Sequence, residues 1–148
     1  MANPDSVAQN YANSFGNYAI ATATAVPLGT TGNAVVALPI LTGGLTVGAN
    51  VASSGSVIVR RVTIQNPSGN VATGNVSILT SNDGNTSNAI VAAAALSSLT
   101  GTGTFQDMTI ANGNVLVSGA TTQALYVKVN TAVTGTVDIR VYGDTVNF

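Results

Sequence analysis

The sequence is a succession of short apolar runs, each closed by a cluster of glycine, asparagine, serine or threonine. The clearest run is SVIVRRVTIQ, residues 56–65, in which β-branched residues occupy most positions, as they do in strands. The next residues, NPSGN, signal a turn because Pro67 fixes its φ angle and Gly69 tolerates a positive φ. About eight to ten such runs recur at spacings of roughly 8–15 residues, which predicts an all-β fold, an antiparallel β-sandwich or jelly roll.

No helical pattern of useful length interrupts these runs, so a parallel α/β sheet is not expected. Residues 89–96 are ambiguous: their alanines favour a helix by intrinsic propensity, whereas the neighbouring runs favour a strand. We prefer a strand over residues 89–94. Pro39 has no backbone N–H to donate, so the run at residues 33–41 is expected at a sheet edge or a bulge.

The last two runs, residues 125–129 and 137–142, alternate apolar and polar side chains. Each therefore predicts a strand with one buried and one exposed face, as in an antiparallel sheet. If the two strands form a hairpin across NTAVTGT, Lys128 lies opposite Asp138 and the two form an ion pair.

The residue types that are missing exclude much chemistry. The 148 residues, the size of one domain, include no His, Cys, Glu or Trp, and only 6% are charged. Nucleophile pairs that need His or Cys, the usual zinc sites and disulfides are therefore excluded. Catalysis by two carboxylates would need Asp107 and Asp144 to face one cleft, and nothing in the pattern brings them together. We expect neither an enzyme nor a cofactor.

The charge and hydropathy patterns also limit the partners. Four cationic residues and a net charge of −1 give no basic patch for nucleic acid. No apolar run reaches the roughly 18–20 residues that span a bilayer, so no membrane is expected. Residues 1–17 lack the basic and apolar regions of a secretory signal.

Half of the cationic residues, Arg60 and Arg61, are adjacent in the strongest predicted strand. Neighbouring strand residues point to opposite faces, so the two cannot act on one ligand unless a bulge intervenes. Arg60 shares its predicted face with Val62 and Ile64, so we expect it to point inward or toward another subunit. There it would need a carboxylate, for which Asp107 is the candidate, or several carbonyls. Arg61 is then available for a contact with another subunit or another protein. A ligand site and simple solvation are the alternatives for this pair.

Residues 81–88, SNDGNTSN, carry alternating oxygen donors such as Asp83 and Asn85. A calcium loop normally adds further carboxylates, including a bidentate one downstream. None follows before Asp107, so we interpret the segment as a β-turn, with a calcium loop as the alternative.

The N-terminal residues differ from the rest of the chain. Residues 1–17 are rich in Asn and Ala, and Tyr11, Phe15 and Tyr18 place three aromatics at or just beyond this segment. We expect residues 1–17 to form an arm and residues 18–148 a single β-sandwich domain. The three aromatics are candidate anchors on a partner.

The segments VRRVTIQNPSGNVATGNVSILTSNDG and ALYVKVNTAVTGTVDIRVYG, in a charge-poor chain without Cys or His, resemble virion proteins of tailed phages. Within that group the chain resembles the decoration, or cement, proteins, which bind the outside of an icosahedral capsid. The resemblance covers residues 60–143.

The resemblance implies a structural role without catalysis. It places the protein on the outer capsid surface, with the major capsid protein as partner and contacts between capsomers as the target. Many copies would multiply small contacts, and a symmetric homo-oligomer such as a trimer would match local capsid symmetry. The alternative is the β-sandwich head of a phage fibre that binds a host receptor or carbohydrate. Tyr126 and Tyr142, if adjacent and exposed, would favour that alternative.

Overall fold

A computed structural model describes residues 18–31, 35–39, 56–111, 116–117 and 124–146. This part of the chain forms nine strands and one short 3-10 helix, η1. Their bounds are β1 Tyr18–Pro27, β2 Val35–Pro39, β3 Ser56–Gln65, β4 Asn75–Leu79, η1 Thr86–Asn88, β5 Ala89–Ala95, β6 Phe105–Met108, β7 Leu116–Val117, β8 Ala124–Thr131 and β9 Thr136–Val146.

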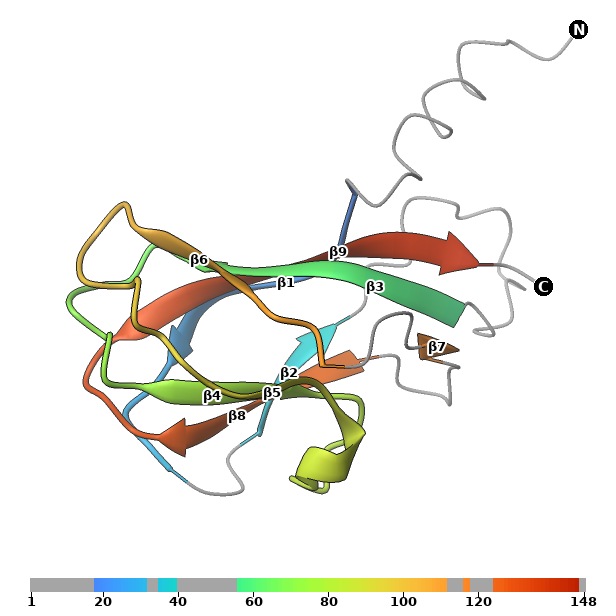
Figure 1. Cartoon of the computed structure of the whole chain (residues 1–148), viewed down its shortest axis with the longest axis horizontal. Coiled ribbons are helices and arrows are strands. Elements are labelled where there is room, and N and C mark those ends of the chain that lie inside the picture. The colour runs from blue at the N-terminus through green and yellow to red at the C-terminus, as the bar shows by residue number, and fades with distance from the viewer. Residues whose placement is uncertain (1–17, 32–34, 40–55, 112–115, 118–123, 147–148) are drawn as a thin grey trace, which may run out of the picture.

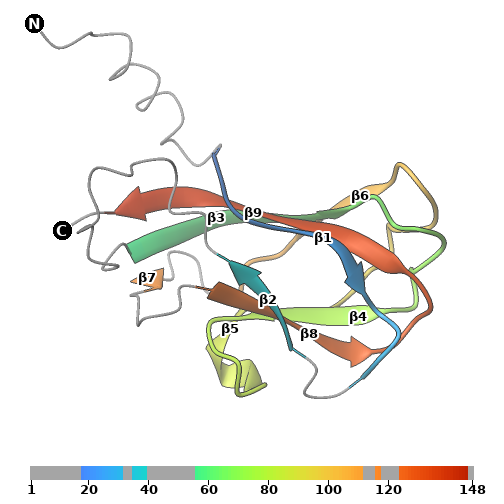
Figure 2. The ribbon, with the colours of Figure 1, turned by 180° about the vertical axis from the view of Figure 1, so that it is seen from behind.

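The strands form two antiparallel sheets that lie face to face, one above the other in Figure 1 and again in the reverse view of Figure 2. The first has the order β1-β9-β3-β6, and the short strand β7 also pairs with β3. The second has the order β2-β8-β4-β5. The predicted all-β sandwich is therefore confirmed, and so is the strand at residues 89–94, which is part of β5.

The pairing follows one nested pattern. Strand β1 pairs with β9, β2 with β8, β3 with β6 and β4 with β5, so the first half of the strands meets the second half in reverse order. Successive pairs fall alternately in the two sheets, as when one long antiparallel ribbon is rolled up. Apart from β7, which pairs with β3 beyond β6, this is the strand order of a jelly roll.

The core lies between the sheets and is built by the alternation of each strand. Val137, Ile139 and Val141 of β9 are fully buried, as are Leu125 and Val127 of β8. Because these two strands belong to different sheets, they face each other across the core. The predicted hairpin between them is therefore wrong. The alternation of apolar and polar residues shows which face of a strand is buried. It does not show whether two such strands are hydrogen-bonded in one sheet or lie in opposite sheets, because both arrangements give the same pattern.

Pro39 ends β2, which is an edge strand of its sheet, as the missing N–H predicts.

In the other sheet, Gly143 of β9 lies between Tyr18 of β1 and Val59 of β3. A Cβ atom at Gly143 would overlap the backbone carbonyl oxygen of Ile58. Only glycine therefore allows β9 and β3 to approach this closely.

Next to Gly143, strand β3 contains a β-bulge. Val59 is paired with Gly143 and Arg61 with Tyr142, so Arg60 is an extra residue on the β3 side. Val59 and Val62 are both buried, three positions apart, while Arg60 and Arg61 are both exposed. The predicted inward direction of Arg60 is therefore wrong, because the bulge shifts the alternation by one residue.

Candidate functional site

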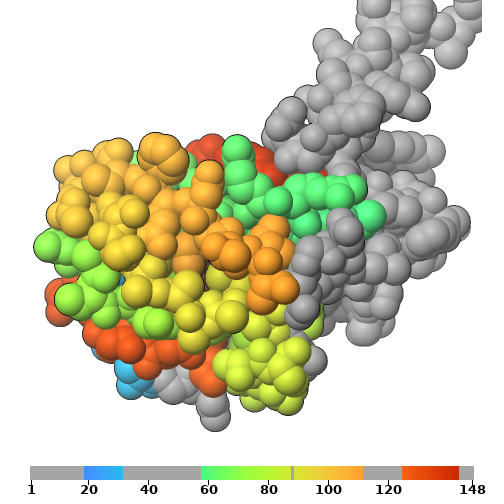
Figure 3. Space-filling model, in the orientation of Figure 1, coloured from blue at the N-terminus to red at the C-terminus, as the bar shows by residue number. Residues whose placement is uncertain are grey.

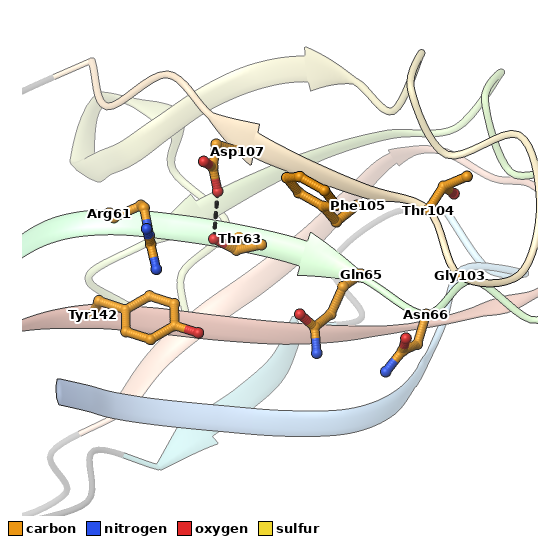
Figure 4. A pocket seen from close by; sticks show the side chains of 9 residues that line it. All are labelled: Arg61, Thr63, Gln65, Asn66, Gly103, Thr104, Phe105, Asp107 and Tyr142. Atoms are coloured by element: carbon orange, nitrogen blue, oxygen red, sulfur yellow. Dashed lines mark hydrogen bonds between the residues drawn. The ribbon is translucent and has the colours of Figure 1, made fainter. Parts of the chain in front are cut away.

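A shallow hollow of about 270 Å³ lies on the outer face of the β1-β9-β3-β6 sheet, and we call it the outer hollow. Figure 4 shows its side chains rising from β3, from β6 and from β9, with the end of β3 and the loop before β6 at one end. In the space-filling view of Figure 3, the orange residues around β6 lie against the green residues of β3. The lining residues are Arg61, Thr63, Gln65, Asn66, Gly103, Thr104, Phe105, Asp107 and Tyr142.

Strand register brings these residues together from distant parts of the sequence. Thr63 of β3 is paired with Asp107 of β6, and Gln65 is paired with Phe105. On the other side of β3, Arg61 is paired with Tyr142 of β9. Paired residues in neighbouring antiparallel strands project to the same face, so the three strands together supply one surface.

Asp107 is fixed by its partner on β3. The Thr63 hydroxyl donates a hydrogen bond of 2.5 Å to Oδ1 of Asp107, and Thr63 itself is almost fully buried. The carboxylate is thereby oriented at the wall of the outer hollow, and its side chain stays exposed. The predicted pair of Arg60 with Asp107 depended on an inward Arg60, and the hydroxyl of Thr63 takes the place assigned to that guanidinium.

Arg61 and Tyr142 form the opposite wall. The guanidinium carbon of Arg61 lies 4.3 Å from the centre of the Tyr142 ring, which is a cation–π contact. At an exposed position such a contact is worth about 0.5–1 kcal/mol. The predicted face of Arg61, shared with Thr63 and Gln65, is the one that lines the outer hollow.

Phe105 is the most unusual residue of the outer hollow. Its side chain is 65% exposed, and it is the one exposed large apolar side chain in the part of the chain that the structure describes. Figure 4 places its ring between Asp107 and Thr104 along the β6 side. A single exposed apolar side chain is common on protein surfaces, so the significance of Phe105 comes from the outer hollow and the polar groups beside it.

The far end of the outer hollow is held by hydrogen bonds. The backbone N–H of Asn66 donates to the Thr104 carbonyl over 3.2 Å. The Thr104 hydroxyl donates to the Gly101 carbonyl over 2.6 Å. Asn66 has a φ of 50°, in the left-handed region that asparagine tolerates better than most residues. These contacts tie the end of β3 to the loop before β6.

Asp138 of β9, the register partner of Gln65, also holds this end through hydrogen bonds. It accepts hydrogen bonds from Nδ2 of Asn66 and from the backbone N–H of Ala25, each over 2.9 Å. Both bonds favour the charged carboxylate, the Asn66 bond most, so the pKa of Asp138 lies below its ordinary value of 3.8. The predicted Lys128–Asp138 ion pair is wrong, because the two residues lie in different sheets.

Lys128 contacts the turn at residues 81–84 of its own sheet instead. Its Nζ donates to the Gly84 carbonyl over 2.7 Å. In the same turn Asp83 accepts from the Ser81 hydroxyl over 2.6 Å and from the Asn85 N–H over 2.9 Å. These bonds, the Ser81 bond first, lower the pKa of Asp83. The segment is a turn that leads into η1, and the described residues contain no group of three or more potential metal-binding side chains.

The structure describes only some of the other aromatic residues predicted to make contacts. Tyr11 and Phe15 lie outside the described residues, and Tyr18 begins β1 opposite Gly143. Tyr126 is on β8 and Tyr142 on β9, so they belong to different sheets and are not adjacent. The aromatic that accompanies Tyr142 is Phe105. The sequence places Phe105 two positions from Asp107, so the two share one face of a strand. That spacing could not show which strands lie beside β6.

No protein-family model, curated protein or solved structure significantly matches this chain. Within the described ranges, no helix has the length and apolar character needed to cross a membrane.

Asp107 is the sole carboxylate among the nine described residues that line the outer hollow. These lining residues offer two aromatic rings, one carboxylate, one guanidinium and two side-chain amides on one face of the sheet.

Proposed function

We propose that this chain is a non-enzymatic structural protein of a virus particle, of the decoration type found on tailed-phage capsids. In this proposal it binds the outer capsid surface, contacts the major capsid protein and stabilises the junctions between capsomers. The observation that carries the proposal is the nested strand order of the two sheets. Jelly rolls with this architecture are frequent among viral capsid domains, although lectins and cupins share it.

Because a fold alone does not define a function, the surface of the domain is the second support. The chain has nine charged residues among 148, from four cationic and five acidic side chains. Strand β5 exposes Ala92, Ala93 and Ala95, which are small and apolar. Such a surface approaches another protein closely with little desolvation of charge. This suits a protein that is packed against a shell in many copies, as a symmetric homo-oligomer such as a trimer.

A sedimentation experiment tests capsid binding. Purified protein is mixed with capsids that lack it, and the capsids are pelleted. We expect saturable co-sedimentation with a stoichiometry fixed by the capsid lattice. Protein that stays in the supernatant at concentrations well above those of the capsid subunits would contradict the proposal.

The head of a phage fibre is the second candidate. The observation that favours it is Phe105, 65% exposed beside Asp107 in the outer hollow. A fibre head is present in far fewer copies than a decoration protein, so the number of copies in a virion distinguishes the two.

A further inference from the structure

We propose that the outer hollow binds an uncharged sugar unit of a polysaccharide. Phe105 would stack on the apolar face of the sugar ring, while Asp107, Arg61 and Gln65 would bond to its hydroxyl groups. This inference concerns a ligand of the domain itself and does not depend on where the protein sits in a virion.

The exposed ring of Phe105 favours a ligand with an apolar face. Phe105 leaves 65% of its side chain in water, although other large apolar side chains of the described residues are covered. Burial in a ligand complex would recover the hydrophobic free energy that this exposure forgoes. A sugar ring presents C–H groups on one face and hydroxyls at its edge. It therefore matches an apolar ring that is bordered by polar side chains.

The polar side chains of the outer hollow include both hydrogen-bond donors and hydrogen-bond acceptors. Asp107 only accepts hydrogen bonds, and a carboxylate has about four lone-pair sites, of which the Thr63 hydroxyl uses one. Arg61 only donates, whereas Gln65 does both. A hydroxyl group can donate to Asp107 while a neighbouring hydroxyl accepts from an N–H group. Polyhydroxylated ligands satisfy such a mixed set, which a purely anionic or purely apolar ligand does not.

Two polar groups of the outer hollow are held in a fixed orientation before any ligand binds. The bond from Thr63 fixes the carboxylate of Asp107, and the Tyr142 ring holds the guanidinium of Arg61 at 4.3 Å. Both contacts are made between strands of one sheet. Polar groups that are placed before binding lose little conformational entropy when a ligand arrives. This favours a weakly interacting ligand such as a sugar.

The net charge and the volume of the outer hollow suit a small, uncharged ligand. The positive charge of Arg61 is balanced by the negative charge of Asp107, and among the described residues the Tyr142 phenol is the one further ionisable group that lines the outer hollow. A phosphate or nucleic acid would need excess positive charge. The volume of about 270 Å³ is small for a drug-sized ligand and suits one or two sugar rings of a longer chain.

An extended peptide is the competing ligand, because β6 is an edge strand of its sheet. A peptide would pair with the backbone of β6 and would not require the Phe105 ring or the Asp107 carboxylate. The substitutions below therefore separate the two ligands.

The test is binding of the full-length protein to a printed array of neutral and acidic glycans and to an array of unstructured peptides. Affinities for positive glycans are then measured by titration calorimetry. We expect binding to neutral glycans that is insensitive to salt, because no net charge is neutralised. Phe105→Ala and Asp107→Asn should each weaken it about tenfold or more, which corresponds to about 1.4 kcal/mol.

Tyr126→Ala is the matched control, since it removes an aromatic side chain from the other sheet. Its affinity should equal that of the wild type, and circular dichroism should show that all variants are folded. Failure of the wild type to bind any neutral glycan would overturn the proposal. So would binding that survives both Phe105→Ala and Asp107→Asn, or binding restricted to acidic glycans or peptides.

Discussion

Arg61 lies over the ring of Tyr142, its register partner on the neighbouring strand, with 4.3 Å between the guanidinium carbon and the ring centre. This relationship exists because Arg60 is the extra residue of a bulge. In an unbroken pairing, the residue opposite Tyr142 would be Arg60. The bulge therefore selects which of the two adjacent arginines faces the outer hollow.

We predict a measurable energetic coupling between Arg61 and Tyr142. A double-mutant cycle with Arg61→Ala and Tyr142→Leu, followed by urea denaturation, should give a coupling of about 0.5–1 kcal/mol. The same cycle with Arg61→Ala and Tyr126→Leu is the control, because Tyr126 is in the other sheet. Equal coupling in both cycles would show that the cation–π contact is absent in solution.

We predict that Gly143→Ala destabilises the domain strongly. The added methyl group would overlap the carbonyl oxygen of Ile58, so β3 and β9 would have to separate. Overpacking of this kind typically costs about 1–3 kcal/mol or more. Gly29→Ala is the control, since a Cβ at Gly29 meets nothing within 4 Å. Melting temperatures of the two variants measure the difference, and similar shifts would argue against the close approach.

We predict that Asp138 makes stability depend on pH in the acidic range. Its folded pKa is lower than its unfolded value of 3.8, mainly through the Asn66 amide. Its contribution is therefore fully present above pH 3.8 and is lost as the pH falls through the folded pKa. Urea denaturation of wild type and Asp138→Asn at several pH values should show the wild type losing more stability on acidification.

Asn66→Gly provides a more specific version of this test. Glycine accepts the positive φ of position 66 but removes the amide that donates to Asp138. Titration of the Asp138 carboxyl by NMR should then give a pKa closer to 3.8 than in the wild type. An unchanged pKa would mean that the Asn66 bond does not stabilise the carboxylate.

We predict that removal of residues 1–17 leaves the domain folded and weakens attachment to capsids. Circular dichroism checks the fold, and co-sedimentation with purified capsids checks attachment. Tyr11→Ala combined with Phe15→Ala in the full chain should have a similar, smaller effect if the aromatics are anchors. Unchanged co-sedimentation of both variants would show that this segment does not hold the capsid.

Much of the fold could be predicted because its signals are local. Alternation in residues 125–129 and 137–142 identified the buried faces correctly. Pro39 indicated an edge strand, and the neighbours of the alanine run indicated that it is β5 and not a helix. Each of these inferences needs only the properties of one strand.

The remaining features depend on relations between strands. The bulge at Arg60 arises from how β3 meets β9 around Gly143, and the β-branched residues that flank the two arginines give no sign of it. The outer hollow needs Asp107 beside Thr63 and Tyr142 beside Arg61, which only the register supplies. The Lys128–Asp138 pair predicted from the sequence failed for the same reason, because β8 and β9 lie in different sheets.

If this chain is a virion protein, as we propose, quantitative mass spectrometry of purified virions tests that function most directly. The account predicts that the protein is present in a copy number of the same order as the major capsid protein. Absence of the protein from virions, or a copy number as low as that of the fibres, would contradict it.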